Sequence, residues 1–406
     1  SGEAAVAQLF YWCNWMHDRL YDLGFTEAAG NMQKDNFSRG GLGQDPLLAE
    51  AQDGADFNNA NYSATRDGRS PRIQMYLFNG PEPWRDAALD AEVILHEYAH
   101  GLTDRLLGGG TGIYGNQAYG LAEGWSDFYA LALLSEPGDD PDGCYAYGGY
   151  MTYGMNGLRE NYYFGIRRFP YTTDLSRNPL TFGDLYENDI VRHPAVPRNP
   201  MISSTGAEAH RMGEVWCATL WEARAKLIHR YGFAEGNQLI LQLVTDSLKL
   251  LPANPTFVEA RDAILLADAV GYQGANRMDL WDAFGKRGLG IAARTQDDMF
   301  GGAYAYESFA VPDALEVQAE GGLSFRGPVE GPFTPGASRF TVQNIRVANL
   351  AWTARSEQPW MRAEPAGGDL AAAAAANVSF TFTAEAALLR SEEHTSELQS
   401  RGLNSY

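Results

Sequence analysis

The sequence predicts an α+β protein in which a small strand region gives way to a mostly helical remainder, followed by a β-sandwich module. Within the first 310 residues, strand-like alternation lies in residues 31–78, whereas apolar residues recur at helical spacing between residues 88 and 287. From residue 315 onward, short β-rich segments alternate with Gly, Pro and Ala. Strands followed by a run of helices are typical of α+β folds. With 406 residues, of which 45% are hydrophobic, the chain can bury large cores.

The individual elements follow from apolar spacing and from the glycines and prolines that bound them. Residues 72–78 alternate like a strand and lead directly into a helix over residues 88–106. Glycine-rich segments at 108–120 and 135–149, and the proline-rich segment 170–200, predict loops. Further helices are expected over residues 4–23, 121–134, 207–231, 237–251, 255–269 and 277–287. Strands of the module are expected over residues 315–325, 338–345, 350–354 and 378–383.

The composition changes at Val311 and Pro312, which suggests a domain boundary. We therefore expect one domain over residues 1–310 and a truncated β-sandwich module over residues 311–389. Residues 390–406 fit neither neighbour, and residues 390–400 resemble the in-frame translation of a sequencing adapter. We expect this tail to be non-native, so that His394 carries no functional meaning.

The charge balance excludes some partners. A formal net charge of −20 argues against nucleic acid or an anionic membrane surface as the main partner. No run of 18 apolar residues is present, so no membrane span is expected. No signal peptide is visible in a chain that begins with Ser1.

The most informative motif is His96-Glu97-Tyr98-Ala99-His100 within the helix expected over residues 88–106. Two histidines four residues apart on a helix project from the same face, one turn apart. One small cation can therefore meet both imidazoles, and the intervening Glu97 can reach a water on that cation. This H-E-x-x-H arrangement indicates two zinc ligands and the general base of a metallopeptidase. The alternative is a helix with two incidental histidines.

A catalytic zinc site needs a third protein ligand. Glu123 and Asp127 stand at positions i and i+4 of the helix expected over residues 121–134. We expect Glu123 to be the third ligand, and Asp127 to accept the other ring N–H of a ligand histidine. Glu123 could alternatively be a carboxylate favoured by the positive end of its helix.

Residues 96–103 (HEYAHGLT), followed by Glu-Gly-Trp-Ser-Asp at 123–127, resemble the fungalysin family of secreted zinc metallopeptidases, which are thermolysin-like gluzincins. The resemblance covers most of residues 4–310 and includes the segments 9–12, 40–54, 168–180 and 254–268. It implies a thermolysin-like fold, one catalytic zinc on His96, His100 and Glu123, and Glu97 as the base. It also implies secretion and synthesis with an N-terminal propeptide.

The same resemblance suggests groups that assist catalysis. His210 resembles the family's histidine that donates a hydrogen bond to the developing oxyanion, and Tyr114 stands where thermolysin relatives carry a tyrosine. A surface tyrosine is the alternative for Tyr114. The acidic residue that orients the histidine in thermolysin-like enzymes is replaced by Thr205, which leaves Glu208 as a candidate. Thermolysin relatives also have an asparagine at the position of Ala122, so the surroundings of His100 differ here.

Substrate, calcium and module sites are less specific. Asn59 and Ala60 resemble the edge strand that pairs with the substrate backbone, although asparagine is also a common turn residue. A calcium site in the acidic loop competes with the alternative of a solvated loop, because no EF-hand spacing is present. The module resembles bacterial Ig-like modules, and Trp352 and Trp360 either fill its core or bind a carbohydrate or another surface. The candidate calcium ligands are Glu136, Asp139, Asp140 and Asp142.

We therefore expect a secreted zinc endopeptidase that hydrolyses internal peptide bonds of proteins. An aminopeptidase would need an acidic group for the substrate's α-amine, and no signature for one is evident in the sequence. The alternative of another class is a catalytically degenerate peptidase fold that acts as a binding or adhesion protein. The complete motif and Glu123 argue against this alternative.

Overall fold

The computed structural model describes residues 2–187, 189–202, 208–297, 302–321, 324–328, 330–346 and 349–389. Two sequence-based predictions concern Thr205 and the tail over residues 390–406, which lie outside these ranges. The chain divides into two compact units, residues 1–311 and 312–406. In the described part of the chain, no helix combines the length and the apolar character that crossing a membrane requires.

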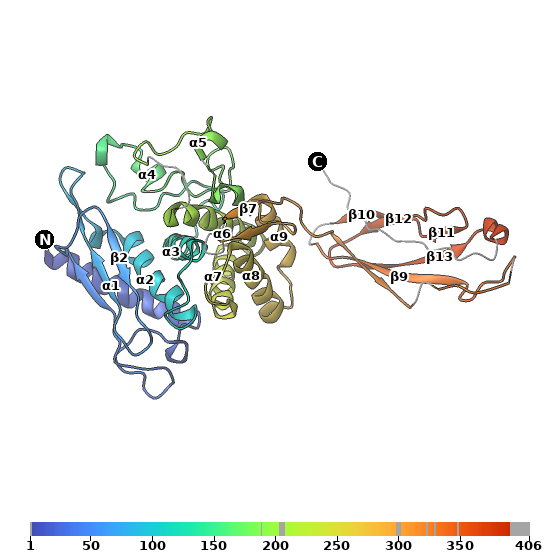
Figure 1. The fold of residues 1–406 in the computed structure, drawn as a ribbon, viewed down its shortest axis with the longest axis horizontal. Coiled ribbons are helices and arrows are strands. Elements are labelled where there is room, and N and C mark those ends of the chain that lie inside the picture. The colour runs from blue at the N-terminus through green and yellow to red at the C-terminus, as the bar shows by residue number, and fades with distance from the viewer. Residues whose placement is uncertain are drawn as a thin grey trace. The chain divides into compact units, whose positions relative to one another are not determined.

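The first unit begins with a long helix and a small sheet and continues as a group of helices (Figure 1). Its long helices are α1 (Gly2–Asp22), α2 (Ala91–Leu106), α3 (Asn116–Leu134), α6 (Ala209–Tyr231), α7 (Phe233–Leu250), α8 (Phe257–Tyr272) and α9 (Arg277–Lys286). Its short elements are β1 (Leu48–Ala51), β2 (Ala60–Ser63), β3 (Arg72–Met75), β4 (Leu77–Phe78), β5 (Arg85–Asp86), α4 (Asn161–Phe164), α5 (Asp189–Arg192), β6 (Arg294–Gln296) and β7 (Tyr304–Tyr306). The unit is therefore α+β, as the sequence predicts.

The three-stranded sheet has the order β1-β3-β2, so β2 is an edge strand. It pairs antiparallel with β3, in a register that sets Ala60 opposite Met75, while β1 is parallel to β3. The predicted strand over residues 72–78 is in fact divided, because Leu77 and Phe78 pair with β5 instead. An edge strand leaves one row of backbone N–H and C=O groups without strand partners. In this sheet both β1 and β2 are edge strands, so β2 carries one such row.

Helix α2 is the central helix of the unit. It starts later than predicted, because the Asp90 side chain accepts a hydrogen bond from Glu92 N at 3.1 Å and caps the helix at Ala91. It packs on α1 and on the sheet strand β2 on one side and on α3 on the other, and most of its residues are buried. A helix that is covered all round can hold polar groups at low exposure only if they find partners.

Helices α3 and α6 approach each other closely through glycines. A Cβ atom added at Gly213 would lie 2.6 Å from the Cβ atom of Glu123, and one added at Gly124 would lie 2.7 Å from the Cβ atom of Trp216. Helix α3 starts at Asn116, so the predicted loop over residues 108–120 is wrong at its end. Gly120, at that end, lies within α3, where an added Cβ atom would lie 2.4 Å from the Cβ atom of Met212 on α6.

The long connection between α3 and α6 is held by buried arginines rather than by regular structure. The Arg168 Nε atom donates to Glu214 on α6 at 3.0 Å, and Arg287 on the segment after α9 donates to the carbonyl oxygens of Thr172 and Asn178 at 2.6 and 2.7 Å. Each arginine satisfies backbone or carboxylate oxygens that would otherwise be buried without a partner. This connection consequently has a fixed position beside α3.

The second unit, described by itself, contains a four-stranded antiparallel sheet of order β11-β13-β9-β8 and a two-stranded sheet of β10 and β12. Side chains of both sheets share one core, in which Trp352 is buried against Phe340 and Val378. Trp360 is half-buried and stacks on Phe382 with ring centroids 6.3 Å apart. The strands are β8 (Leu315–Ala319), β9 (Ala337–Asn344), β10 (Leu350–Thr353), β11 (Met361–Glu364), β12 (Gly367–Leu370) and β13 (Ala375–Phe382).

Replacement of Gly213 by alanine should separate α3 from α6. We expect Gly213→Ala to lower the free energy of unfolding by about 1–3 kcal/mol, the usual result of overpacking a core. The matched control is Gly271→Ala in α8, where an added Cβ atom meets no heavy atom within 4 Å. That change should raise the free energy of unfolding by about 0.4–1 kcal/mol. Thermal or denaturant unfolding measures both, and equal effects of the two substitutions would contradict the close approach.

Candidate active site

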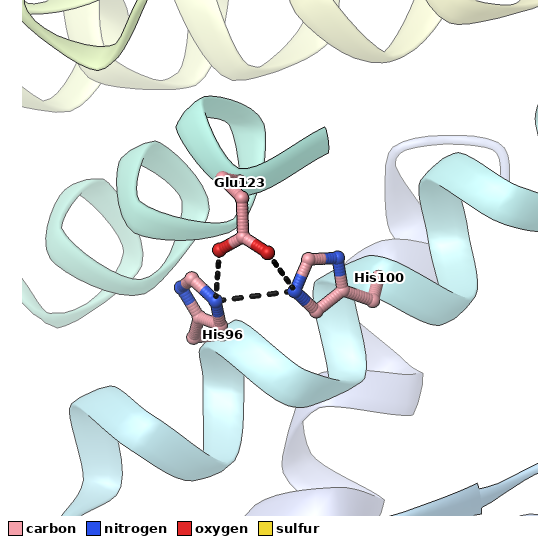
Figure 2. Close-up of side chains that lie close together, drawn as sticks. All are labelled: His96, His100 and Glu123. Atoms are coloured by element: carbon pink, nitrogen blue, oxygen red, sulfur yellow. Dashed lines mark hydrogen bonds and ion pairs between the residues drawn. The ribbon is translucent and has the colours of Figure 1, made fainter. Parts of the chain in front are cut away.

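Two histidines of α2 and one glutamate of α3 converge on one point (Figure 2). The Nε2 atoms of His96 and His100 lie 3.1 Å apart. The two carboxylate oxygens of Glu123 lie 3.2 Å from His96 Nε2 and 3.6 Å from His100 Nε2. In the described part of the chain, this is the one group of three or more His, Cys, Asp or Glu side chains whose ligand atoms lie close enough together to hold a metal ion.

The spacing and chemistry of these atoms fit a zinc ion. A tetrahedral zinc with bonds of about 2.0–2.1 Å separates neighbouring ligand atoms by roughly 3.3 Å, close to the three distances observed here. Without a metal the carboxylates decide where a proton resides. Burial alone would lower the pKa of His96, but Asp127 and Glu123 raise it to about 9, whereas burial lowers the pKa of His100 to about 4. One metal cation can therefore bind between the Nε2 atoms of His96 and His100 and the Glu123 carboxylate.

Asp127 stands behind the ligand His96, one turn after Glu123 on α3. Its Oδ1 atom lies 2.8 Å from His96 Nδ1, so His96 is held with Nε2 directed at the other ligands. The guanidinium of Arg167 donates to both oxygens of the same carboxylate at 2.6 and 2.7 Å, and the Tyr171 hydroxyl donates a further short hydrogen bond. Burial alone would raise the pKa of Asp127, but Arg167 and His96 hold it well below its usual range. Asp127 is therefore a carboxylate anion in a buried site.

Glu97 is buried beside His96 and lines the same cleft. Burial raises its pKa to about 7, and the negative charge of Glu123 adds to this effect, while His96 and His210 oppose it. A carboxylate whose pKa lies near neutrality is suited to accept a proton and pass it on.

His210 lies in the first turn of α6, three residues before Gly213, where α6 approaches α3. Its Nε2 atom is 3.5 Å from Glu123 Oε2. The Glu208 carboxylate caps α6, accepts from the backbone N–H of His210 at 3.2 Å, and lies 2.6 Å from the ring nitrogen Nδ1. Burial opposes protonation of His210, but the Glu123 and Glu208 carboxylates outweigh it and raise the pKa of the ring. Glu208, which the sequence leaves as a candidate, is thus in contact with His210.

His96, His100, Glu123, Glu97 and His210 line a cleft of about 390 Å³. Ala60 and Tyr62 of the edge strand β2 border it together with Asn59, which directly precedes β2. Ala122 and Tyr119 of α3 face it as well. Tyr114 lies outside this lining and is 53% exposed in the segment before α3, so the structure does not bring it together with the other predicted residues. Tyr119 of α3, one turn before Glu123, does line the cleft.

Some groups at the site were not predicted from the sequence. Arg167 and Tyr171 come from the long connection after α3, and Tyr147 lies under His96 with ring centroids 5.0 Å apart. No spacing in the sequence relates them to the motif. An arginine in a segment without regular structure, 40 residues after Asp127, gives no periodic signal.

The acidic loop does not form a second metal group. The Asp139 carboxylate accepts from Glu136 N at 2.8 Å and Asp140 accepts from Asp142 N at 3.0 Å, so both stabilise turns. The carboxylate of Asp142 accepts from the Thr173 hydroxyl at 2.6 Å and lies 2.8 Å from His229 Nε2. Calcium in this loop stays a prediction without support from the arrangement of the described side chains.

Comparison with known proteins agrees with this geometry. A family model described as "Fungalysin metallopeptidase (M36)" matches residues 1–293. The chain belongs to the fungalysin family. Extracellular metalloproteinases of Pyricularia oryzae and Aspergillus fumigatus are 39% and 38% identical to this fungalysin chain over 307 and 308 residues, which are 71% and 72% of it. The chain spans 44% of the length of each relative. None of these names supports the alternative of a binding or adhesion protein.

One solved structure, the precursor of protealysin, a metalloproteinase from Serratia proteamaculans, has a TM-score of 0.48 with this fungalysin chain. The two are 16% identical, and the alignment covers 70% of this chain and 79% of that one. This similarity is too low to inform individual residues.

Substitution of Asp127 should loosen the metal site of this fungalysin chain. We expect Asp127→Asn to weaken zinc binding by about 10–100-fold, because His96 loses the group that fixes its tautomer. Competition with a chromogenic chelator measures the affinity. Glu214→Gln is the matched control, since it also removes a buried carboxylate from an arginine pair but contacts no ligand. Equal zinc affinities in the two variants would contradict the role of Asp127.

Proposed function

We propose that this chain is a secreted zinc endopeptidase that hydrolyses internal peptide bonds of proteins. The observation that carries the proposal is the convergence of His96, His100 and Glu123 beside the buried Glu97. Secretion is proposed from the names of the relatives, which describe extracellular metalloproteinases. A propeptide as partner rests on the family resemblance.

The substrate is proposed to bind as an additional strand along β2. The edge position of β2 and the presence of Asn59 and Ala60 in the cleft lining support this role. Backbone hydrogen bonds of this kind hold a peptide in an extended form without demands on its side chains. An internal stretch of chain can then cross the cleft and place one carbonyl group at the catalytic residues.

His96, His100 and Glu123 would hold the zinc ion, which when bound would lower the pKa of a water and polarise the carbonyl group of the substrate. Glu97 accepts a proton from the attacking water and later delivers it to the leaving amine, a role supported by its pKa of about 7. His210 donates a hydrogen bond to the oxygen that becomes negative. Glu208 keeps the His210 ring in that direction, and Asp127 does the same for His96. Tyr114 is retained as an assisting group on the family resemblance alone.

We propose the domain division 1–310 for the peptidase and 311–389 for a truncated Ig-like module, with a non-native tail after it. The division into compact units near residue 311 supports the boundary. The burial of Trp352 supports a structural role of this tryptophan in the module core, in preference to a carbohydrate-binding role.

Removal of the base should separate metal binding from catalysis. We expect Glu97→Gln to keep bound zinc and to lose about 10²–10⁴-fold in kcat, because the proton of the attacking water has no acceptor. Internally quenched, N-blocked peptides and casein are the substrates, and mass spectrometry measures zinc. A zinc chelator should abolish turnover by the wild type.

Two results would overturn the proposed function. If wild type and Glu97→Gln hydrolysed casein equally, Glu97 would not be the base. If only peptides with a free N-terminus were cleaved, the chain would be an aminopeptidase.

Loss of the carboxylate beside His210 should lower catalysis without affecting the metal. We expect Glu208→Gln to reduce kcat by about 10–100-fold, because a small displacement of a catalytic group has effects of this size. Zinc affinity should not change. Thr256→Ala, which removes the cap of α8, is the control for the loss of a helix cap. An unchanged kcat in Glu208→Gln would exclude Glu208 as a positioning residue.

A further inference from the structure

One buried carboxylate in the cleft takes no part in the mechanism above. Asp104 lies on α2, one turn after His100, and lines the same cleft. It is only 6% exposed, and its Oδ2 atom has no hydrogen-bond partner among the described residues. Buried polar atoms are almost always paired, because an unpaired one costs about 1–3 kcal/mol. A carboxylate left in this state at the wall of a binding cleft therefore requires an explanation.

The neighbouring cation does not provide a hydrogen bond. Arg105 directs its guanidinium to Asp45 at 2.8 Å and to the Arg69 carbonyl oxygen at 2.9 Å. Its charge lowers the pKa of Asp104 only in part, and burial raises that pKa to about 6. At neutral pH, Asp104 is consequently an anion for most of the time, with no cation bonded to it.

The surroundings of Asp104 suit a long cationic side chain. Tyr62 of β2, Ala64 and Ile113 line the cleft together with it, and the Tyr62 ring stacks on His100 with centroids 6.5 Å apart. Lysine and arginine bury an aliphatic stem against apolar and aromatic surfaces while their charged ends seek an anion. Because Tyr62 belongs to the strand proposed to pair with the substrate, a substrate side chain directed toward α2 meets Asp104.

We propose that Asp104 forms the floor of a subsite that accepts a cationic group of the peptide substrate, the side chain of a lysine or arginine. The inference rests on the proposed peptidase function and adds a preference to it. The α-amine of a peptide carries the same ammonium chemistry. It would reach Asp104 only if the chain end lay in the cleft, so the experiment must separate the two sources.

The test compares lysine with norleucine, which has nearly the same stem without the charge. N-blocked quenched peptides carry one or the other at each of several positions around the scissile bond, and a second series has free N-termini. We expect one position at which the wild type prefers lysine by about 10–100-fold in kcat/KM, in line with a charge-assisted hydrogen bond. Asp104→Asn should remove this ratio, and Asp104→Ser is a second variant in case the first does not fold.

Asp22→Asn is the matched control, because it removes an exposed carboxylate of α1 outside the cleft and should leave the ratio unchanged. A wild type that cleaves norleucine peptides but shows no lysine preference in the N-blocked series would overturn this inference alone. A preference limited to free N-termini would also overturn it, in favour of the α-amine. Zinc loss in Asp104→Asn with an unchanged ratio would make Asp104 a positioning residue for His100 instead. A wild type that cleaves no peptide would overturn the proposed function, and the inference with it.

Discussion

The carboxylate of Asp127 joins three separate parts of the molecule at one buried point. It meets His96 of α2, and it accepts hydrogen bonds from Arg167 and Tyr171 of the long connection after α3. A buried carboxylate is stable as an anion only where such partners surround it. Helix α2, helix α3 and the long connection after α3 must therefore assemble together. Because the partners of Asp127 come from all three, the direction of His96 follows from the packing of the whole unit.

The contact of α3 with α6 adds the second requirement. Gly213 and Gly124 allow the two helix backbones to approach, and His210 stands one turn before this contact. The separation of 3.5 Å between His210 Nε2 and Glu123 Oε2 therefore depends on these two glycines, because neither has a side chain that would hold the helices apart. A catalytic group on a helix end gains precision when the helix itself has little freedom to shift.

The cleft combines charges of both signs, of which Glu97, Asp104 and Arg167 are buried and His210 is exposed. Glu97, Glu123 and Asp104 face it as carboxylates, and Arg167 and His210 face it as cations or donors. Each of the three carboxylates has a different environment. Glu123 faces three histidines, Glu97 has mainly burial to raise its pKa, and the Asp104 Oδ2 atom has no hydrogen-bond partner among the described residues. Carboxylates that differ in this way can serve as ligand, base and substrate contact within one cleft.

The sequence by itself determined the parts of the site that are local. Helical spacing places His96 and His100 on one face, and the same rule relates Glu123 to Asp127, so the metal group and the α+β class were accessible without coordinates. Tertiary structure decided the rest, because contacts between distant segments leave no periodic trace. Three features depend on how helices and connections pack. They are the contact of Glu208 with His210, the hydrogen bonds of Arg167 to Asp127 and the lack of a hydrogen-bond partner for Asp104 Oδ2 among the described residues. Gly120 illustrates the limit, since it ends the glycine-rich segment that predicts a loop but lies within α3, against Met212 of α6.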